Sequence, residues 1–593
     1  MEFKKPRGII FWLICYLFLL SGFIVWAYSY DNWQIKEQLT FISPLILGLN
    51  FFLILIGIII NIELFQEITK IITKKTWILV VLITLGGIIL AAFVAPRTHR
   101  IFYDEDIYLN VGQNIAFLKK AGMCNEGGNL YGEYFCSQLE YNKEPNGWPY
   151  LLSVFYRLLG ASHMASFLLN NILWGLSGFI IFWVGYLLFR NINTGLFGAL
   201  IFIFIPEGIR WSNTTAAEPS TTFFGGLAVL AVFLFIRYPG NKPLFLASVL
   251  IPFASQFRPE SILIVIPAGL GLLLLTPREF TRNRLYGFIF IALLLSLPHF
   301  IHIFAVKGEG WGAPGGVKFG LRYLKNNFSV NSLFYFNNAR FPLLFSLLFF
   351  LGIVFPRNNK SNNGLPQGKF SEYLFVKEKA ILLGWFFAFW GIFLCFYAGS
   401  YNYGADVRFS LMSYFPLAIS AGYGVASLCG WAECRFDITW LDKGIIALII
   451  FSFLPFMPYI RAETQEAWGA RADHHFAKEI VDLLPANSLV LTHNPNMFLL
   501  WGRDAAQAAV GMQGEYMDDL FNRYKGGIYF HYNFWCNVDD PSQRSFCQNV
   551  LSRYAVKEIK SYQEQNYKFS LYQLDRIDPE RSAEMPKRPP KSQ

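Results

Sequence analysis

Charged residues are scarce in this chain of 593 residues. Asp, Glu, Lys and Arg make up 15% of it, whereas hydrophobic residues make up 54% and include 61 Phe, 30 Tyr and 16 Trp. In a typical soluble protein, about a quarter of the residues are charged. Crossing a bilayer core takes about 20 helical residues, and many apolar runs here approach or reach that length. The composition therefore excludes a soluble globular protein and predicts a polytopic α-helical membrane protein.

Several motifs for soluble enzyme chemistry are also missing. The sequence contains no P-loop, no dinucleotide-binding fingerprint and no Ser-His-Asp signal, so nucleotide-driven chemistry is not expected. No cysteine pair has zinc-site spacing with histidines, and no carboxylate with ligand spacing accompanies His299 and His302. We therefore expect no cofactor and no metal. The net charge of +10 lies largely in short loops, which is typical of membrane topology rather than of nucleic-acid binding.

About thirteen apolar stretches predict membrane helices. The Lys and Arg residues collect in alternate loops, and the positive-inside rule then places the N-terminus in the cytoplasm. The basic segment before residue 8 precedes an apolar run too long for a signal peptide. An odd number of helices leaves the C-terminal region outside a plasma (inner) membrane. The stretches are 8–28, 41–62, 77–95, 163–189, 195–211, 215–236, 243–257, 260–275, 285–305, 341–355, 380–398, 409–429 and 444–460.

The chain divides into three parts. Residues 1–460 form the membrane domain, with large outer loops at 97–162 and 307–340. Residues 461–578 resemble a small extracytoplasmic α/β domain, and 579–593 form a Pro/Lys-rich disordered tail. Within the α/β domain, apolar or alternating patterns predict strands, and two longer segments predict helices. The strands are expected at 488–492, 527–530 and 567–572, and the helices at 472–484 and 550–560.

Four of the eight cysteines form two close-spaced pairs in polar outer regions. Cys124 and Cys136 lie in the first outer loop, and Cys536 and Cys547 lie in the C-terminal region. Disulfides form in oxidising compartments outside the cytoplasm. Each pair is therefore a disulfide candidate, and both pairs agree with the predicted topology.

An acidic triplet, Asp104-Glu105-Asp106, follows the third apolar stretch by about eight residues. Carboxylates this close to a bilayer are costly unless they face water, a partner or a substrate. Ile107, Val111 and Ile115 repeat at helical spacing, so the triplet opens a helix. Favourable interaction with the helix dipole explains one or two carboxylates and leaves the third unexplained. The triplet is thus a candidate chemical centre, with Asp106 the member most simply explained as helix-start charge.

Charged residues also stand at outer helix ends. Arg258 and Arg408 have the planar guanidinium that binds phosphate through two parallel hydrogen bonds. Interfacial snorkelling is the alternative explanation for outer arginines, and Glu260 is placed to neutralise Arg258. Glu218 begins a membrane helix and would be costly to bury unpaired, although pairing with the helix dipole is an alternative.

Several of these stretches together resemble one family. Asp104-Glu105-Asp106-Ile107-Tyr108 matches an Asp-Glu-x-x-Tyr pattern, and Trp148-Pro149 stands where a Pro-containing element precedes a surface helix. Ala217-Glu218-Pro219, Phe257-Arg258-Pro259-Glu260 and Arg408-Phe409 follow in order. Residues 77–430 are similar to the GT-C glycosyltransferases that use polyprenyl-phosphate-linked sugars, which include protein O-mannosyltransferases and the aminoarabinose transferase of lipid A. The basic residue usual before a Pro-Pro pair is missing here.

The resemblance implies an inverting, metal-independent transfer of a sugar from a polyprenyl-phosphate donor to a hydroxyl of a lipid, protein or glycan acceptor on the outer face. Asp104 would be the general base and Glu105 its helper. Arg258 and Arg408 would bind the donor phosphate. Substrate binding is assigned to Glu218, Tyr108 and Glu260. The partners are the donor, the acceptor and membrane lipids, with no nucleic acid. The alternative is a transporter or flippase of a lipid-linked glycan, which predicts an internal repeat and charges at mid-membrane.

Overall fold

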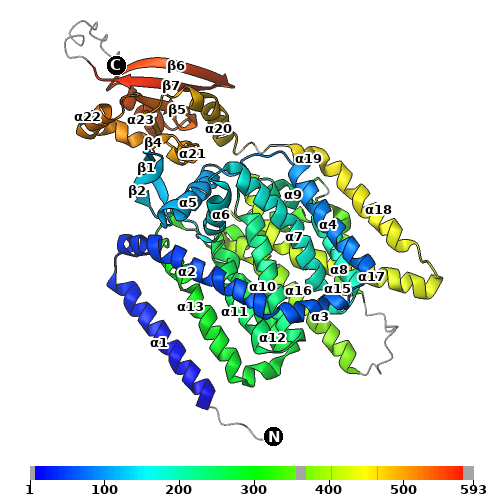
Figure 1. Cartoon of the computed structure of the whole chain (residues 1–593). Helices are drawn as coiled ribbons and strands as arrows, with labels where there is room; N and C mark the ends of the chain where they lie inside the picture. The colour runs from blue at the N-terminus through cyan, green and yellow to red at the C-terminus, as the bar shows by residue number, and fades with distance from the viewer. Residues whose placement is uncertain are drawn as a thin grey trace.

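The computed structural model describes residues 7–310, 312–337, 339–355, 369–402, 404–463, 465 and 467–577. The predicted tail at 579–593 lies outside these ranges. Most of the chain is a bundle of helices, with a mixed sheet at one end (Figure 1).

All thirteen predicted apolar stretches form helices. Within the described ranges, nine helices are long and apolar enough to cross a membrane, or ten if the bent pair α8–α9 counts as one span. The stretch 259–275 and helices α11 and α15 are shorter. The helices are α1 (Arg7–Ser29), α2 (Asn32–Ile60), α4 (Lys74–Phe93), α7 (His163–Phe189), α8 (Ile192–Ile203), α9 (Pro206–Ser212), α10 (Glu218–Arg237), α11 (Asn241–Ser255), η1 (Pro259–Ile264), α12 (Val265–Leu275), α13 (Asn283–Ala305), α15 (Leu343–Val354), α16 (Lys369–Ile392), α17 (Tyr414–Phe436), α18 (Leu441–Phe453) and α19 (Met457–Arg461).

The break between α8 and α9 has a local cause. The two helices meet at 63°, and Pro206 is the first residue of α9. Proline has no backbone N–H and disfavours helical backbone in the residue before it, so the helix stops ahead of Pro206 and restarts in a new direction.

The sheet has seven strands in the order β2-β1-β4-β3-β5-β7-β6. Strand β3 is parallel to β4 and β5, and the other pairs are antiparallel. Strands β1 and β2 come from the first large loop, so two distant parts of the chain build one sheet. The strands are β1 (Met123–Leu130), β2 (Glu133–Glu140), β3 (Leu489–Thr492), β4 (Asp504–Gln507), β5 (Ile528–Tyr532), β6 (Ala555–Glu564) and β7 (Tyr567–Asp575).

The strands predicted in the C-terminal region are confirmed as β3, β5 and β7, and the first predicted helix is confirmed as α20 (Trp468–Ile480). The helix predicted at 550–560 is wrong. Helix α23 (Pro541–Leu551) ends there, and β6 follows as an edge strand paired with β7. The Lys and Glu residues of β6 lie on an exposed edge, where charge protects a strand from aggregation, and they resemble the polar face of a helix in sequence.

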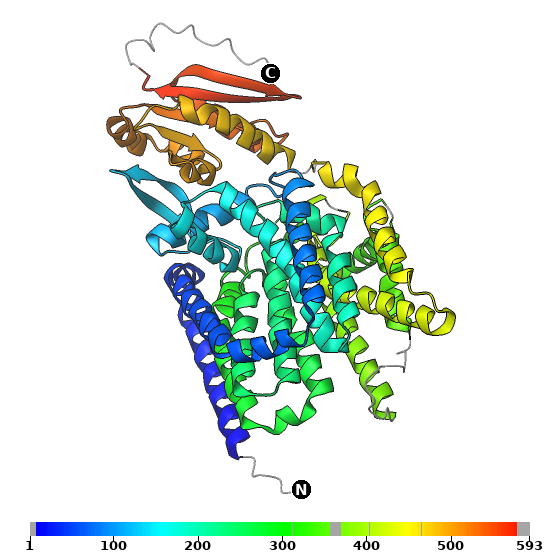
Figure 2. The same ribbon diagram turned by 45° about the vertical axis from the view of Figure 1, so that its right-hand side comes forward.

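Both predicted disulfides are present. Cys124–Cys136 joins β1 to β2, and Cys536–Cys547 joins the segment after β5 to α23. Figures 1 and 2 show the sheet seated on the bundle beside α5 (Asp104–Leu118) and α6 (Gly147–Leu159), with the start of α1 at the opposite end. The chain is therefore a polytopic helical membrane protein with a small α/β domain, as predicted.

Candidate active site

Helix α5 begins at Asp104, and the three carboxylates of its first turn point in different directions. Each helical residue turns by about 100°, so residues two apart lie on nearly opposite sides. The side chain of Asp104 is 24% exposed, whereas Glu105 and Asp106 are buried. The triplet is thus three separate sites rather than one cluster.

Asp104 faces a cavity. Its Oδ1 lies 3.5 Å from Nζ of Lys143, and the charge of Asp104 raises the pKa of Lys143. The lysine therefore stays protonated and holds the carboxylate in place, while the exposed part of Asp104 remains open to a ligand.

Glu105 is fully enclosed by the protein. Its Oε1 accepts hydrogen bonds from the backbone N–H groups of Arg100 (2.7 Å) and Ile101 (2.9 Å). Its Oε2 accepts from the backbone N–H and the hydroxyl of Thr215, at 2.9 and 2.8 Å, and lies 3.2 Å from Nδ1 of His99. Glu105 thus fixes the loop before α5 and the segment before α10. The structure does not bring it to the cavity that Asp104 faces.

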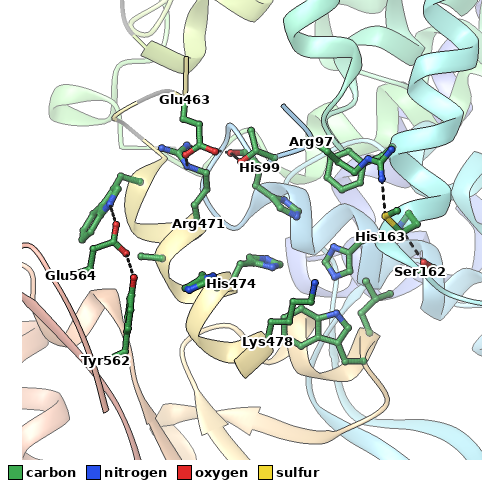
Figure 3. Close-up of a pocket in the computed structure, with 18 of the residues that line it drawn as sticks. Arg97, His99, Ser162, His163, Glu463, Arg471, His474, Lys478, Tyr562 and Glu564 are labelled. Carbon is green, nitrogen blue, oxygen red and sulfur yellow. Dashed lines mark hydrogen bonds and ion pairs between the residues drawn. The ribbon is translucent and has the colours of Figure 1, made fainter. Parts of the chain in front are cut away.

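Asp106 is more than a helix-start charge. Its Oδ1 lies 2.6 Å from Nε2 of His474, and its Oδ2 accepts a hydrogen bond of 2.7 Å from Asn494. His474 belongs to α20, in the C-terminal part of the chain, and His99 and His163 lie beside it (Figure 3). Asp106 therefore joins the membrane domain to the C-terminal domain.

The cavity at Asp104 has a volume of about 470 Å³ and brings several predicted site residues together. Aromatic rings also line the cavity, among them those of Phe319, Phe393, Phe396 and Phe409. The charged residues that line it are Asp104, Lys143, Glu144, Arg258, Glu260, Lys307, Lys318, Asp406 and Arg408. Asp104, Arg408 and the Arg258–Glu260 segment thus share one cavity although the three places lie far apart in sequence.

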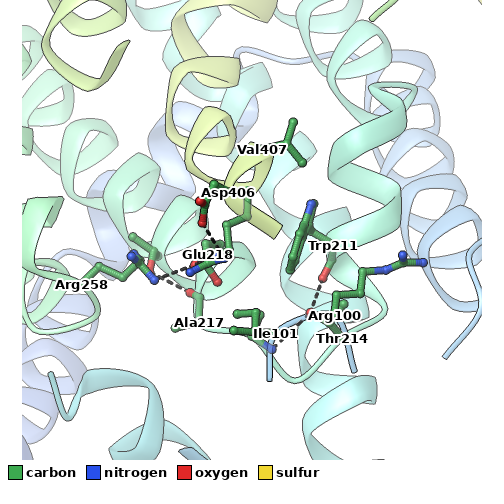
Figure 4. Close-up of polar contacts among 12 residues, drawn as sticks. Arg100, Ile101, Trp211, Thr214, Ala217, Glu218, Arg258, Asp406 and Val407 are labelled. Carbon is green, nitrogen blue, oxygen red and sulfur yellow. Dashed lines mark hydrogen bonds and ion pairs between the residues drawn. The ribbon is translucent and has the colours of Figure 1, made fainter. Parts of the chain in front are cut away.

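Glu218 anchors both arginines without lining the cavity itself. Its Oε1 accepts hydrogen bonds from Nη1 of Arg258 at 2.6 Å and from Nε of Arg408 at 2.7 Å, and Figure 4 shows Arg258 pointing at it. Arg258 also donates to Glu260 at 2.6 Å, and Arg408 lies 3.3 Å from Asp406. A buried charge needs such partners to be tolerated. The network fixes two guanidinium groups side by side.

Phe409 supports the same pair of arginines. The guanidinium carbons of Arg258 and Arg408 lie 5.1 and 4.6 Å from the centre of its ring. Such cation–π contacts stabilise cations by about 0.5–2 kcal/mol without using their hydrogen-bond donors. Phe409 therefore leaves donors on both arginines available to an anionic ligand.

Tyr108 and Glu144 lie next to this network. Tyr108 is buried, and burial raises the pKa of its hydroxyl. Burial also raises the pKa of Glu144, although the charge of Arg258 opposes the shift. Glu144 lines the cavity, whereas Tyr108 does not appear among the lining residues. A carboxyl with a raised pKa is able to take up a proton when an anion arrives nearby.

Sequence reasoning missed Lys143, Glu144 and Asp406. The sequence carried a signal for the first two, because Lys143-Glu144-Pro145 stands directly before α6. Lys143 lies five residues before Trp148, and its Nζ contacts Asp104 at 3.5 Å. Asp406 had no distinct signal, since a short polar turn between helices commonly contains Asp.

An apolar groove of about 490 Å³ adjoins the charged cavity. It lies between α1 and α13, and Ile303 and Lys307 line both spaces. The groove is lined by Tyr16, Leu19, Leu20, Phe23, Leu293, Leu297, Phe300, Ile303, Phe304 and Lys307. A long hydrocarbon chain could lie there while its polar end reached the arginines.

Comparison with known proteins finds one matching family model and a shared fold. The model of the dolichyl-phosphate-mannose-protein mannosyltransferase family matches residues 143–302. The chain shares its fold with two crystal structures of ArnT from Cupriavidus metallidurans. The structure bound to undecaprenyl phosphate is 12% identical, with a TM-score of 0.53 over 84% of this chain and 98% of that chain. The structure of the apo state is 11% identical, with a TM-score of 0.50 over 83% of this chain and 97% of that chain. No curated protein matches. The resemblance predicted from the sequence is thus found again in a family model that matches part of the chain and in a fold shared with ArnT.

Proposed function

We propose that this chain is an integral membrane glycosyltransferase that moves a sugar from a polyprenyl-phosphate donor to an acceptor hydroxyl. One observation carries the proposal: the carboxylate of Asp104 faces the same cavity as the paired guanidinium groups of Arg258 and Arg408. The undecaprenyl phosphate bound to ArnT in a structure of the same fold supports a donor of this class.

The cavity suits an inverting displacement. Asp104 takes the proton of the acceptor hydroxyl as a general base, a role that contributes about 10²–10⁴-fold. The hydroxyl oxygen forms a bond to the anomeric carbon while the bond from that carbon to the phosphate oxygen breaks. The electron pair remains on the departing phosphate, whose charge Arg258 and Arg408 stabilise. Lys143 holds Asp104 in position, since their charged atoms lie 3.5 Å apart.

The donor phosphate competes with carboxylates for the arginines. Arg258 contacts Glu218 and Glu260, and Arg408 contacts Glu218 and Asp406. These contacts offset the cost of burying the two guanidinium groups. Each guanidinium carries five N–H donors, so phosphate binding uses the remaining ones and does not require every ion pair to break.

The rest of the donor fits the neighbouring groove. The apolar walls between α1 and α13 would hold the polyprenyl chain, and Lys307 stands where the groove meets the charged cavity. Because the polyprenyl tail is already in lipid, the groove would position it through van der Waals packing rather than by removing it from water. The sugar then lies near Asp104.

Two features support a site on the outer face of a plasma (inner) membrane. The sheet domain and the start of α1 lie at opposite ends of the bundle (Figure 1), which fits an N-terminus in the cytoplasm and a C-terminal domain outside it. Both disulfides lie in the sheet domain, and disulfides persist in oxidising compartments. The acceptor is a hydroxyl of a lipid, protein or glycan on that side.

The test is Asp104→Asn in a transfer assay with purified protein and polyprenyl-phosphate sugars. We expect turnover to fall by about 10²–10⁴-fold while binding of polyprenyl phosphate and the melting temperature stay near wild type. Asp539→Asn is the control, because the Asp539 side chain is 99% exposed in the C-terminal domain. Turnover of Asp104→Asn within a factor of ten of wild type would overturn the base assignment. Movement of intact lipid-linked sugar across the membrane without transfer would indicate a flippase.

A further inference from the structure

A second cluster of reactive side chains lies on the other side of α5. We propose that His99, Asp106, His163 and His474 bind one divalent transition-metal ion, with Zn²⁺ the best match. Each residue offers one ligand atom, and the four atoms all lie within 4.8 Å of one another. Three imidazoles and one carboxylate are the ligand types that Zn²⁺ prefers. Sequence spacing predicted no metal because the four residues come from separate segments.

The distances suit a four-coordinate ion. In a tetrahedral zinc site with ligands at about 2.1 Å, neighbouring ligand atoms lie about 3.4 Å apart. The separation of 2.6 Å between Asp106 Oδ1 and His474 Nε2 is shorter than this, and no pair exceeds 4.8 Å. The ring centres of His99 and His163 lie 4.3 and 5.3 Å from that of His474. Small side-chain rotations therefore close the four atoms around one ion.

An imidazole nitrogen of His163 has no hydrogen-bond partner among the described residues. Nε2 of His163 is buried and makes no hydrogen bond within the described part of the chain. Leaving a buried polar atom unsatisfied costs about 1–3 kcal/mol, and native proteins rarely do so without a reason. A metal ion in the cluster would satisfy this nitrogen.

The surroundings of the cluster fit a metal site too. Glu105 Oε2 lies 3.2 Å from Nδ1 of His99, which leaves Nε2 of that ring for the ion. Asn494 donates a hydrogen bond to the second oxygen of Asp106 at 2.7 Å. Metal-binding histidines commonly contact a carboxylate through their other ring nitrogen, and ligating carboxylates are themselves hydrogen-bonded. Glu105 and Asn494 therefore act as positioning residues.

An ion can reach the cluster from solvent. His99, His163 and His474 line a cavity of about 730 Å³ between the membrane helices and the C-terminal domain, shown in Figure 3. Arg97 and Arg471 line the same cavity, and their positive charge opposes a cation. The negative charges of Asp106 and Glu105, both buried at the cluster, offset this repulsion.

The ion would join four segments of the protein. His99 lies in the loop after α4, Asp106 in α5, His163 at the start of α7, and His474 in α20. It would thus link the C-terminal domain to the membrane domain and hold the first turn of α5, whose other side carries Asp104. The role is structural, and the proposal does not depend on the glycosyltransferase reaction.

The test is metal binding by the full-length protein, purified in detergent through a tag free of histidine and stripped with a chelator. We expect one Co²⁺ per chain with the intense visible absorption of a four-coordinate ion, displaced by one Zn²⁺. His163→Ala and His474→Ala should each weaken Zn²⁺ binding by about 100-fold and abolish the rise in melting temperature on adding Zn²⁺.

His475→Ala is the matched control. His475 is the next residue of α20, but its side chain is 59% exposed and pairs with Glu479. It should bind metal as wild type does. Absence of stoichiometric Co²⁺ or Zn²⁺ binding by the wild-type protein would overturn the proposal, and so would unchanged binding by His163→Ala. The wild-type cobalt spectrum decides the question even if the alanine variants fail to fold.

Discussion

Replacing Glu218 by Gln tests whether the two arginines form a phosphate site. Glu218 is 3% exposed, and one of its oxygens accepts hydrogen bonds from both Arg258 and Arg408. Gln has nearly the same shape and keeps an oxygen acceptor, but it removes the negative charge that the two guanidinium groups share. The substitution therefore changes the electrostatics of the site with little change in packing.

The expected loss of stability follows from these two contacts. Removing one partner of a buried ion pair costs about 3–5 kcal/mol, because it leaves an uncompensated buried charge. Gln keeps an oxygen acceptor, and Glu260 and Asp406 still contact the two arginines, so the free energy of unfolding should fall by less than this full cost. The melting temperature of the ligand-free protein in detergent should fall accordingly.

Ligand binding should change in the opposite sense. In Glu218→Gln the arginines lack their shared anion, so polyprenyl phosphate should bind at least as tightly as to wild type and should restore more of the melting temperature. Glu279→Gln is the control, because Glu279 pairs with Arg282 at 2.6 Å and Arg284 at 2.8 Å away from the cavity. It should lower stability without changing the response to the lipid.

Isothermal titration calorimetry with polyprenyl phosphate gives the affinity, and a thermal-shift titration gives the change in melting temperature. A tenfold weaker affinity in Glu218→Gln, about 1.4 kcal/mol, would refute the view that Glu218 competes with phosphate for the arginines. A loss of the same size in Glu279→Gln would show that the effect comes from general destabilisation.

Three further predictions concern the cavity and the sheet domain. Arg408→Lys should weaken donor binding about tenfold, measured by titration, because lysine cannot donate to Glu218 and phosphate in the fixed planar geometry of Arg408. Unchanged affinity would contradict phosphate binding by Arg408. Burial raises the pKa of Glu144, and phosphate raises it further, so binding takes up a proton and affinity should fall as pH rises through the range where free Glu144 ionises. Glu144→Gln should flatten that pH profile, and a profile identical to wild type would exclude Glu144. Replacing Cys536 and Cys547 by Ala removes a disulfide that spans 11 residues. The free energy of unfolding of the C-terminal domain, measured by chemical denaturation, should fall by about 3 kcal/mol. A negligible change would show that this disulfide constrains the unfolded chain little.

The helical framework was predictable because each membrane helix is a local signal. A run of about 20 apolar residues must form a helix in lipid, since no water is present to satisfy its backbone. All thirteen stretches are helical, and within the described residues nine helices, or ten with the bent pair α8–α9, are long and apolar enough to cross a membrane. The strands of the C-terminal domain were partly predictable from short apolar runs, whereas β6 was not, because its exposed alternation of charge looks like a helix surface.

The partners of the acidic triplet were not predictable from sequence. Asp106 meets His474, which is 368 residues away, and Glu105 meets Thr215, which is 110 residues away. Nothing local distinguishes the three carboxylates, because adjacent residues of one helical turn differ only in direction. What the sequence did indicate was the charge at this position and the arginines at the ends of other helices.

The position of β1 in the sheet has a consequence for biosynthesis. Glu126 of β1 pairs with Ala506 of β4, so 380 residues separate the two partners. At a synthesis rate of about 5–20 residues per second, the β1–β2 hairpin waits about 20–75 s for its neighbour. During that time the edge of β1 is open to wrong pairing, and the Cys124–Cys136 link holds the hairpin in register. Strand β4 is synthesised long after β1, so the sheet can be completed only when the C-terminal strands pair with the earlier β1–β2 hairpin.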